Sequence, residues 1–282
     1  MLNLSDTLVL IRGGGDLATG VAHRLHQAGF TVMVTELPQP LCVRRAVAFA
    51  EAVYAGRATV DGVTARLAPD AASGMAYAVL NEVPVIVDPA GLALRQLRPP
   101  IVVDARLAKH RLDTTRADAP LVVALGPGFE AGADCHAVVE TQRGHDLGRV
   151  RWRGFTAPDS GEPEAVRGLA MERVLRAPSA GVFTAVKTIG DPVQKGEVVG
   201  LVDYAPLVAQ CAGVLRGVLH DGLSVTPGLK VGDIDPRAVR EYCFSISDKA
   251  RAVGGGVLEA ILAGARFWRR ELPPEVRDRG LP

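Results

Sequence analysis

The chain has 282 residues, of which 48% are hydrophobic, and this length and apolar content suffice for about two domains with buried cores. Its 32 Lys and Arg nearly balance its 31 Asp and Glu, which excludes wholesale binding to nucleic acid or to an acidic membrane surface. The first residues do not have the character of a signal peptide, and no apolar run reaches about 18 residues. We therefore expect a cytoplasmic protein that does not enter the membrane.

A glycine-rich turn follows the first apolar run, residues 8–11, and precedes a helical pattern over residues 17–29. The turn reads Arg12-Gly-Gly-Gly-Asp-Leu-Ala-Thr-Gly20 and fits a relaxed dinucleotide fingerprint, in which backbone N–H groups approach a phosphate. The binding candidates in it are Gly13, Gly14, Gly15 and Asp16.

The next expected strand, residues 30–36, ends in Glu36, where a ribose-binding carboxylate is expected. An ordinary strand-to-helix turn followed by a solvated acid explains the same residues. Residues 38–53 then have the 3.6-residue period of a helix, with Arg44 and Arg45 in its first turns. These arginines face either an anion near Glu36 or solvent.

Two further apolar runs, residues 83–88 and 100–104, predict buried strands that end in Asp88 and Asp104. Ligands bind at the carboxyl ends of parallel strands in such folds. Asp104, with Arg106 and Lys109 close behind it, is therefore a candidate for the site, and simple strand termination is the alternative. The four cysteines and six histidines are scattered, so we expect no metal site.

The second half begins after a Pro- and Gly-rich break at residues 154–168. It contains an internal repeat with an offset of 32 residues, as between Gly181 and Gly213. The repeat resembles biotinyl and lipoyl carrier domains. Residues 202–209, which correspond to the hairpin that carries the modified lysine in those families, contain no Lys, so we expect no covalent biotin or lipoate.

Three consecutive glycines, at positions 254 to 256, interrupt the helical pattern of residues 245–262. Either the helix packs very close to another backbone there, or it restarts and forms a second anion-binding turn beside Lys249 and Arg251.

These patterns predict an α/β fold class: a Rossmann-like, mostly parallel sheet, a small all-β barrel-sandwich hybrid module and a C-terminal helix. The expected domains are a nucleotide- or cofactor-binding domain at residues 1–154, the β-module at residues 169–240, and a helix and tail at residues 241–282 that could pack on the first domain.

Several long strings together resemble the YqeB family, the accessory proteins of the selenium-dependent molybdenum hydroxylase system. These strings are the glycine turn, Gly126-Pro-Gly-Phe129, Cys135-His-Ala-Val-Val-Glu-Thr-Gln-Arg-Gly-His145, Gly232-Asp-Ile-Asp-Pro-Arg237 and Ile246-Ser-Asp-Lys-Ala-Arg-Ala-Val-Gly-Gly-Gly-Val-Leu-Glu-Ala260. The Rossmann-like part is also distantly similar to the XdhC-type chaperones that handle molybdenum cofactor.

The resemblance implies a maturation factor that binds a molybdopterin-type cofactor or a cytidine nucleotide; it favours a cofactor-binding accessory protein over an enzyme and leaves turnover open. Its expected partners are a molybdenum hydroxylase or other maturation factors, and a homo-oligomer is compatible with this role. Cys135 and Cys243 are the candidate thiols for sulfur or selenium transfer, with inert buried thiols as the alternative. Two other functions remain open, an NAD(P)-dependent oxidoreductase and a ligand-free scaffold.

Overall fold

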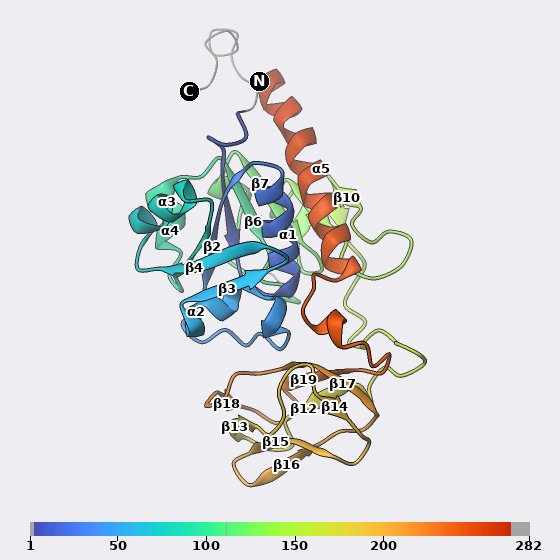
Figure 1. Ribbon diagram of the computed structural model, residues 1–282. Coiled ribbons are helices and arrows are strands. Elements are labelled where there is room, and N and C mark those ends of the chain that lie inside the picture. The colour runs from blue at the N-terminus through green and yellow to red at the C-terminus, as the bar shows by residue number, and fades with distance from the viewer. Residues whose placement is uncertain (1–2, 111, 272–282) are drawn as a thin grey trace.

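A mixed sheet forms the larger part of the computed structural model, which describes residues 3–110 and 112–271 (Figure 1). Among the described residues it has nine strands in the order β10-β9-β7-β6-β1-β2-β5-β4-β3. The seven from β9 to β4 are parallel, and β10 and β3 pair antiparallel at the two edges. The strands are β1 (Leu8–Arg12), β2 (Thr31–Glu36), β3 (Arg57–Val60), β4 (Val63–Ala68), β5 (Val83–Val87), β6 (Ile101–Asp104), β7 (Leu121–Leu125), β9 (Ala137–Val139) and β10 (Val150–Arg151).

Alternating residues of the parallel strands build two cores, one on each face of the sheet. Val9 and Ile11 of β1 pack with α1 and α5 on one face, while Leu8 and Leu10 pack on the face that α3 and α4 cover. This alternation is the period of two that a strand imposes on its side chains. The helices are α1 (Asp16–Gln27), α2 (Ala52–Ala55), α3 (Ala71–Val79), α4 (Leu92–Leu97) and α5 (Asp248–Glu271), with short 3-10 turns η1 (Arg45–Val47), η2 (Phe49–Glu51), η3 (Arg116–Asp118) and η4 (Arg240–Cys243).

The helix predicted over residues 38–53 is replaced by η1, η2 and the short α2. Two backbone N–H groups of this segment make tertiary hydrogen bonds instead of helical ones. Phe49 donates to the Thr19 hydroxyl at 2.8 Å, and Ala50 donates to the Gly14 carbonyl at 2.8 Å. The segment is thereby fastened to the glycine turn, and its apolar residues are buried without a continuous helix.

The β-module contains two four-stranded antiparallel sheets among the described residues, β12-β19-β17-β14 and β16-β15-β13-β18 (Figure 1). Equivalent strands of the two halves begin 32 residues apart, as in β13 at Gly181 and β17 at Gly213. The strands are β12 (Val174–Arg176), β13 (Gly181–Ala185), β14 (Pro192–Val193), β15 (Val198–Val202), β16 (Ala205–Val208), β17 (Gly213–Val218), β18 (Ser224–Val225) and β19 (Lys230–Asp235), and a small separate pair joins β8 (Glu130–Ala131) to β11 (Gly154–Phe155).

Helix α5 returns from the β-module to the large sheet and lies beside α1 (Figure 1). Its three glycines are inside one continuous helix, so they form no second anion-binding turn. A Cβ on Gly254 would lie 2.7 Å from the carbonyl oxygen of Gly20 in α1, and one on Gly256 would lie 2.1 Å from that of Gly148. Close backbone packing therefore accounts for these two glycines.

The predicted fold class, a Rossmann-like sheet with a biotinyl/lipoyl-like module, was wrong. The large sheet is mixed, because the hairpin through Asp61 and Gly62 adds β3 antiparallel to β4, and β10 adds antiparallel to β9. In addition, residues 126–136 connect β7 to β9 through a loop and β8, where a Rossmann fold would place a crossover helix. The described helices include none long and apolar enough to span a bilayer.

Candidate functional site

The ends of four adjacent parallel strands form one wall of a cleft of about 590 Å³. Arg12 is the last residue of β1, Glu36 of β2 and Asp104 of β6, while Asp88 follows β5. The cleft is lined by Arg12, Glu36 and Asp88, by Arg106, and by Lys230 from the β-module. The acidic residues predicted at the strand ends therefore lie beside a cavity. Asp104 does not line this cavity, because its side chain is fully buried behind the cleft wall.

The glycine turn contacts the protein itself at the position predicted for a phosphate. The N–H of Gly14 donates to the Glu36 carboxylate at 2.7 Å. Gly13 has φ +93°, and a Cβ there would lie 3.1 Å from the Ala105 carbonyl oxygen, so the turn requires glycine at this position. The N–H of Asp16, at the start of α1, faces the thiol of Cys42, a half-buried residue that lines the cleft. The Glu36 carboxylate and the Cys42 thiol therefore face the N–H groups that a pyrophosphate would need, so the turn is poorly suited to bind one.

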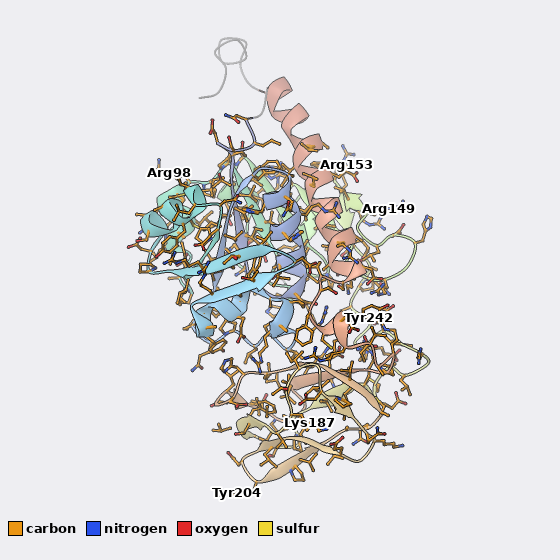
Figure 2. All side chains as sticks on the ribbon, in the orientation of Figure 1. Arg98, Arg149, Arg153, Lys187, Tyr204 and Tyr242 are labelled. Carbon is orange, nitrogen blue, oxygen red and sulfur yellow. The ribbon has the colours of Figure 1, made fainter. Side chains whose placement is uncertain are left out.

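The charges around the turn reinforce this conclusion. Burial raises the pKa of Glu36, and hydrogen bonds from Gly14 and Leu37 oppose the increase only in part. Asp16 pairs with Arg44 at 3.0 Å. Arg44 also donates to the Tyr242 carbonyl oxygen at 3.3 Å, where the β-module approaches the large sheet (Figure 2). A phosphate at the turn would therefore meet two carboxylic groups, and Arg44 is already engaged by one of them.

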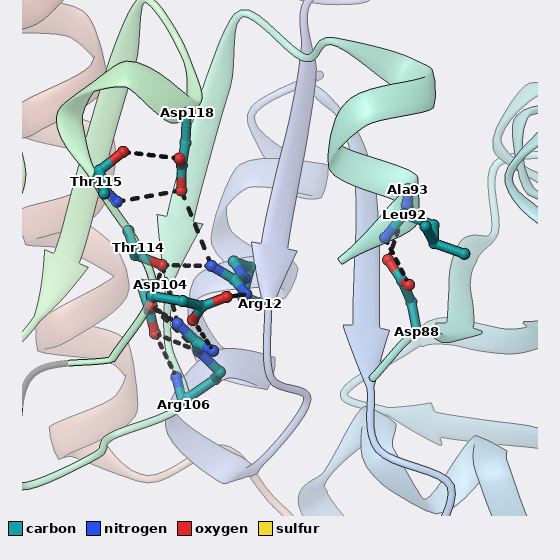
Figure 3. A network of polar contacts seen from close by, with 10 residues as sticks. Arg12, Asp88, Leu92, Ala93, Asp104, Arg106, Thr114, Thr115 and Asp118 are labelled. Carbon is teal, nitrogen blue, oxygen red and sulfur yellow. Dashed lines mark hydrogen bonds and ion pairs between the residues drawn. The ribbon is translucent and has the colours of Figure 1, made fainter. Parts of the chain in front are cut away.

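A second group of charges lies at the ends of β1 and β6 (Figure 3). The Asp104 carboxylate accepts hydrogen bonds from the Arg106 side chain at 2.6 to 3.2 Å and from the Thr114 hydroxyl at 2.6 Å. Thr114 is also within hydrogen-bonding distance of Arg12, at 2.6 Å, and of Arg106, at 2.9 Å. Asp113 then accepts one bond of 2.7 Å from each guanidinium. The two arginines are thereby held side by side at the cleft wall.

Asp113 differs from Asp104 in its exposure to solvent. Its side chain is 66% exposed, whereas that of Asp104 is fully buried. Partial burial opposes ionisation of Asp113, but the hydrogen bonds from Arg12 and Arg106 outweigh this effect and hold its pKa at about 2. Asp88 has a local role, because both of its carboxylate oxygens accept N–H bonds at the start of α4 (Figure 3).

The structure places four predicted cationic residues outside the cleft lining. Arg45 donates to the Val218 carbonyl oxygen at 3.1 Å and to Glu51 at 3.4 Å. Lys109 pairs with Asp159 at 2.7 Å. Lys249 is half-buried, and burial lowers its pKa, while Arg251 is exposed on α5.

The two candidate thiols are also away from the cleft. Cys135 and Cys243 are fully buried. Burial raises the pKa of Cys135 to about 12 and also raises that of Cys243. A role for either thiol in transfer chemistry stays a prediction. No cluster of His, Cys, Asp or Glu side chains suited to a metal ion occurs among residues 3–110 and 112–271.

Sequence reasoning missed Asp113, Thr114 and Cys42, and it did not give Arg12 a role of its own. Arg12 was visible as the last residue of an apolar strand, at the same strand-end position as Asp104. Asp113 and Thr114 lie in an irregular segment about 100 residues from Arg12, and no local pattern connects them.

Comparison with known proteins gives one curated relative. YqeB of Escherichia coli strain K12, described as an uncharacterized protein, is 49% identical over 255 residues, which cover 90% of the chain and 47% of YqeB. The chain therefore spans about half the length of this relative. No family model matches the sequence.

Two solved structures have low similarity to the chain. One is a succinylglutamate desuccinylase/aspartoacylase from Rhodobacter sphaeroides, with 18% identity, a TM-score of 0.25 and coverage of 82% of this chain and 85% of that one. The other is an aspartoacylase family protein from Mesorhizobium loti, with 12% identity, a TM-score of 0.27 and coverage of 81% and 84%. Such TM-scores are too low to transfer a fold or an activity.

The functional prediction was wrong. It described an accessory protein of a selenium-dependent molybdenum hydroxylase that binds a nucleotide or molybdopterin-type cofactor through the glycine turn, with an NAD(P)-dependent oxidoreductase or a ligand-free scaffold as alternatives. YqeB is described as an uncharacterized protein, so the comparison gives the molybdenum and selenium link no support. Within the chain, the contacts of Gly14 with Glu36 and of Asp16 with Arg44 disfavour a phosphate at the turn.

The family resemblance itself is confirmed by the identity to YqeB over most of the chain. The comparison thus supports the resemblance to the YqeB family over 255 residues, which make up 47% of the length of YqeB.

Proposed function

We propose that the chain binds a small organic anion in the cleft at the strand ends. The observation that carries the proposal is the convergence of two guanidinium groups on one point of the cleft wall. Arg12 ends β1, Arg106 lies two residues after the end of the adjacent parallel strand β6, and each contacts the same carboxylate at 2.7 Å. Paired arginines in this arrangement suit a planar anion, since each supplies charge-assisted hydrogen bonds in a fixed geometry.

Apolar side chains on another part of the lining favour an organic ligand over an inorganic ion. Leu37 is 55% exposed and Leu41 is 52% exposed, and both line the cleft together with Pro40. Exposed leucines at a cavity bury apolar surface when a carbon skeleton binds, which is favourable. The volume of about 590 Å³ suits a small metabolite, whose pockets usually have 300 to 1,000 Å³.

The acids on the glycine-turn side define the opposite end of the ligand. Asp16 uses one carboxylate oxygen to pair with Arg44, and Glu36 is directed at Gly14 and Leu37. Groups that face these acids must donate hydrogen bonds, so we expect a hydroxyl or ammonium group there. The ligand would lie with its anion at Arg12 and Arg106 and its donor group near Asp16.

Calorimetric titration with acetate, succinate, citrate, glutamate and benzoate tests the proposal. Leu41→Asp places a negative charge in the cleft lining at an exposed position. At roughly 8 Å and an effective dielectric constant of about 40, its repulsion of a bound anion costs about 1 kcal/mol, which weakens affinity about fivefold. Leu262→Asp is the matched control, because Leu262 is 48% exposed on α5 and outside the cleft.

We expect at least one acid to bind the wild-type chain and Leu41→Asp to weaken its binding, with Leu262→Asp unchanged. Binding that both variants leave equal would place the ligand elsewhere. The absence of binding by all five acids would end the proposal.

A further inference from the structure

Asp113 is the most exposed member of the arginine network. Although its side chain is 66% exposed, both of its oxygens make short bonds, one with Arg12 and the other with Arg106. Exposed ion pairs usually contribute little to stability, because water competes for the charges. The geometry of this pair is that of a bound carboxylate, with one guanidinium on each oxygen.

The two arginines are held in place without Asp113. The buried Asp104 carboxylate binds the Arg106 guanidinium from behind, and the Thr114 hydroxyl contacts both guanidinium groups (Figure 3). Removal of the Asp113 carboxylate would therefore leave two oriented guanidinium groups that line the cleft. Because these side chains are already ordered, less of their conformational entropy is lost when a ligand binds.

The chain around Asp113 is anchored independently as well. Thr114 is fully buried and donates to Asp104 at 2.6 Å. The next residues form a capping box at the start of η3, in which Thr115 and Asp118 exchange hydrogen bonds. The Asp113 side chain can leave the arginines without loss of these contacts, so its place is exchangeable.

The charge balance favours a carboxylate over a phosphate. Asp104 neutralises Arg106, whereas the acidic groups that contact Arg12 among the described residues are Asp113 at 2.7 Å and, more distantly, Asp118 at 3.9 Å. One negative charge completes this balance. A doubly charged phosphate would bring one negative charge more than this balance requires. That charge would lie close to the buried Asp104 carboxylate, and repulsion between like charges at close range is costly.

We propose that Asp113 holds the place of a ligand carboxylate, so that the ligand of the cleft is a carboxylic acid whose carboxylate displaces Asp113 from Arg12 and Arg106. This inference rests on the proposed function of the cleft. Asp113 then acts as an internal competitor, and it sets the affinity of the cleft for its ligand.

Asp113→Asn tests the competition, because it removes the charge and retains the size of the side chain. The control is Asp146→Asn, since Asp146 also pairs with two arginines, Arg149 at 2.9 Å and Arg151 at 3.2 Å, and neither of these arginines lines the cleft, whereas Arg12 and Arg106 do. Succinate, citrate, glutamate and inorganic phosphate serve as probes in calorimetric titrations of the full chain. Asp113→Ala is a second variant in case the amide itself binds to the arginines.

We expect Asp113→Asn and Asp113→Ala to bind the carboxylates about tenfold more tightly than the wild type, with Asp146→Asn unchanged. Phosphate should gain less than the carboxylates. The inference is overturned if carboxylates bind the wild type while neither Asp113 variant tightens their binding, and the proposed function survives that result. An equal or larger gain for phosphate would overturn the carboxylate assignment. If no carboxylate binds the wild type or either variant, the proposed function fails as well.

Discussion

The three consecutive glycines of α5 allow a test of the helix packing inside one element. Each Gly→Ala change gains about 1 kcal/mol from helix propensity. A Cβ on Gly255 has no neighbour within 4 Å among the described residues, so Gly255→Ala should keep this gain. On Gly256 the Cβ would lie 2.1 Å from the Gly148 carbonyl oxygen, and on Gly254 it would lie 2.7 Å from that of Gly20. Backbone atoms must move at these two positions.

Overpacking of this kind costs about 1 to 3 kcal/mol, and the cost should be at the upper end where the contact is shortest. After the gain from propensity, we expect Gly256→Ala to lose about 2 kcal/mol and Gly254→Ala to lose less, while Gly255→Ala gains up to about 1 kcal/mol. Urea denaturation followed by circular dichroism measures all three differences. If the three variants shift the free energy of unfolding in the same direction by equal amounts, the packing of α5 on α1 and on Gly148 is not as described.

Two other predictions concern titrating groups. The pKa of Asp113 is about 2 in the folded chain, below its ordinary value of 3.8. Ionised Asp113 therefore stabilises the folded state above about pH 4, and this stabilisation is lost as the pH falls towards 2. Because the side chain is 66% exposed, Asp113→Asn should lower the free energy of unfolding by at most about 1 kcal/mol at pH 7. A difference from the wild type that persists undiminished at pH 2 in urea titrations would contradict this reasoning. The other prediction concerns the buried thiols. With a pKa of about 12, only about one Cys135 thiol in ten thousand is ionised at pH 8. Because Cys243 is buried as well, we expect both cysteines to react with a disulfide reagent far more slowly in the native chain than in urea. Fast labelling of either one in the native protein, located by mass spectrometry, would show that the thiol is accessible.

The gathering of acids at one edge of the sheet could be predicted from the sequence. Apolar runs that end in Glu36, Asp88 and Asp104 read as parallel strands, and the carboxyl ends of parallel strands share an edge. The antiparallel strands at the two edges of the sheet could not be predicted in this way. The dipeptide Asp61-Gly62 is typical of a hairpin turn, but nothing local specifies which strand of the hairpin joins the sheet, because that choice depends on distant partners.

The contents of the site were harder to predict than its location. A glycine turn has the same sequence whether its N–H groups meet a ligand or a side chain, and here the Gly14 N–H donates a hydrogen bond to the Glu36 carboxylate. The arginine network joins Arg12 to Asp113 across about 100 residues, so spacing rules for helices and strands do not reach it. The glycines of α5 had two explanations in the sequence, and only the neighbouring carbonyl oxygens distinguish them.

The β-module lies between α1 and α5 in the sequence, and this position has a consequence for synthesis on the ribosome. The strands of the large sheet and α1 precede the β-module along the chain, but α5, which packs against α1 and β7, follows it. Val253 and Val257 of α5 belong to the same apolar core as Val21 of α1. A nascent chain therefore carries this uncovered apolar surface while the whole β-module is translated, a period in which chaperones or premature aggregation can act on it. Helix α5 thus completes a core that α1 and the first strands of the large sheet began.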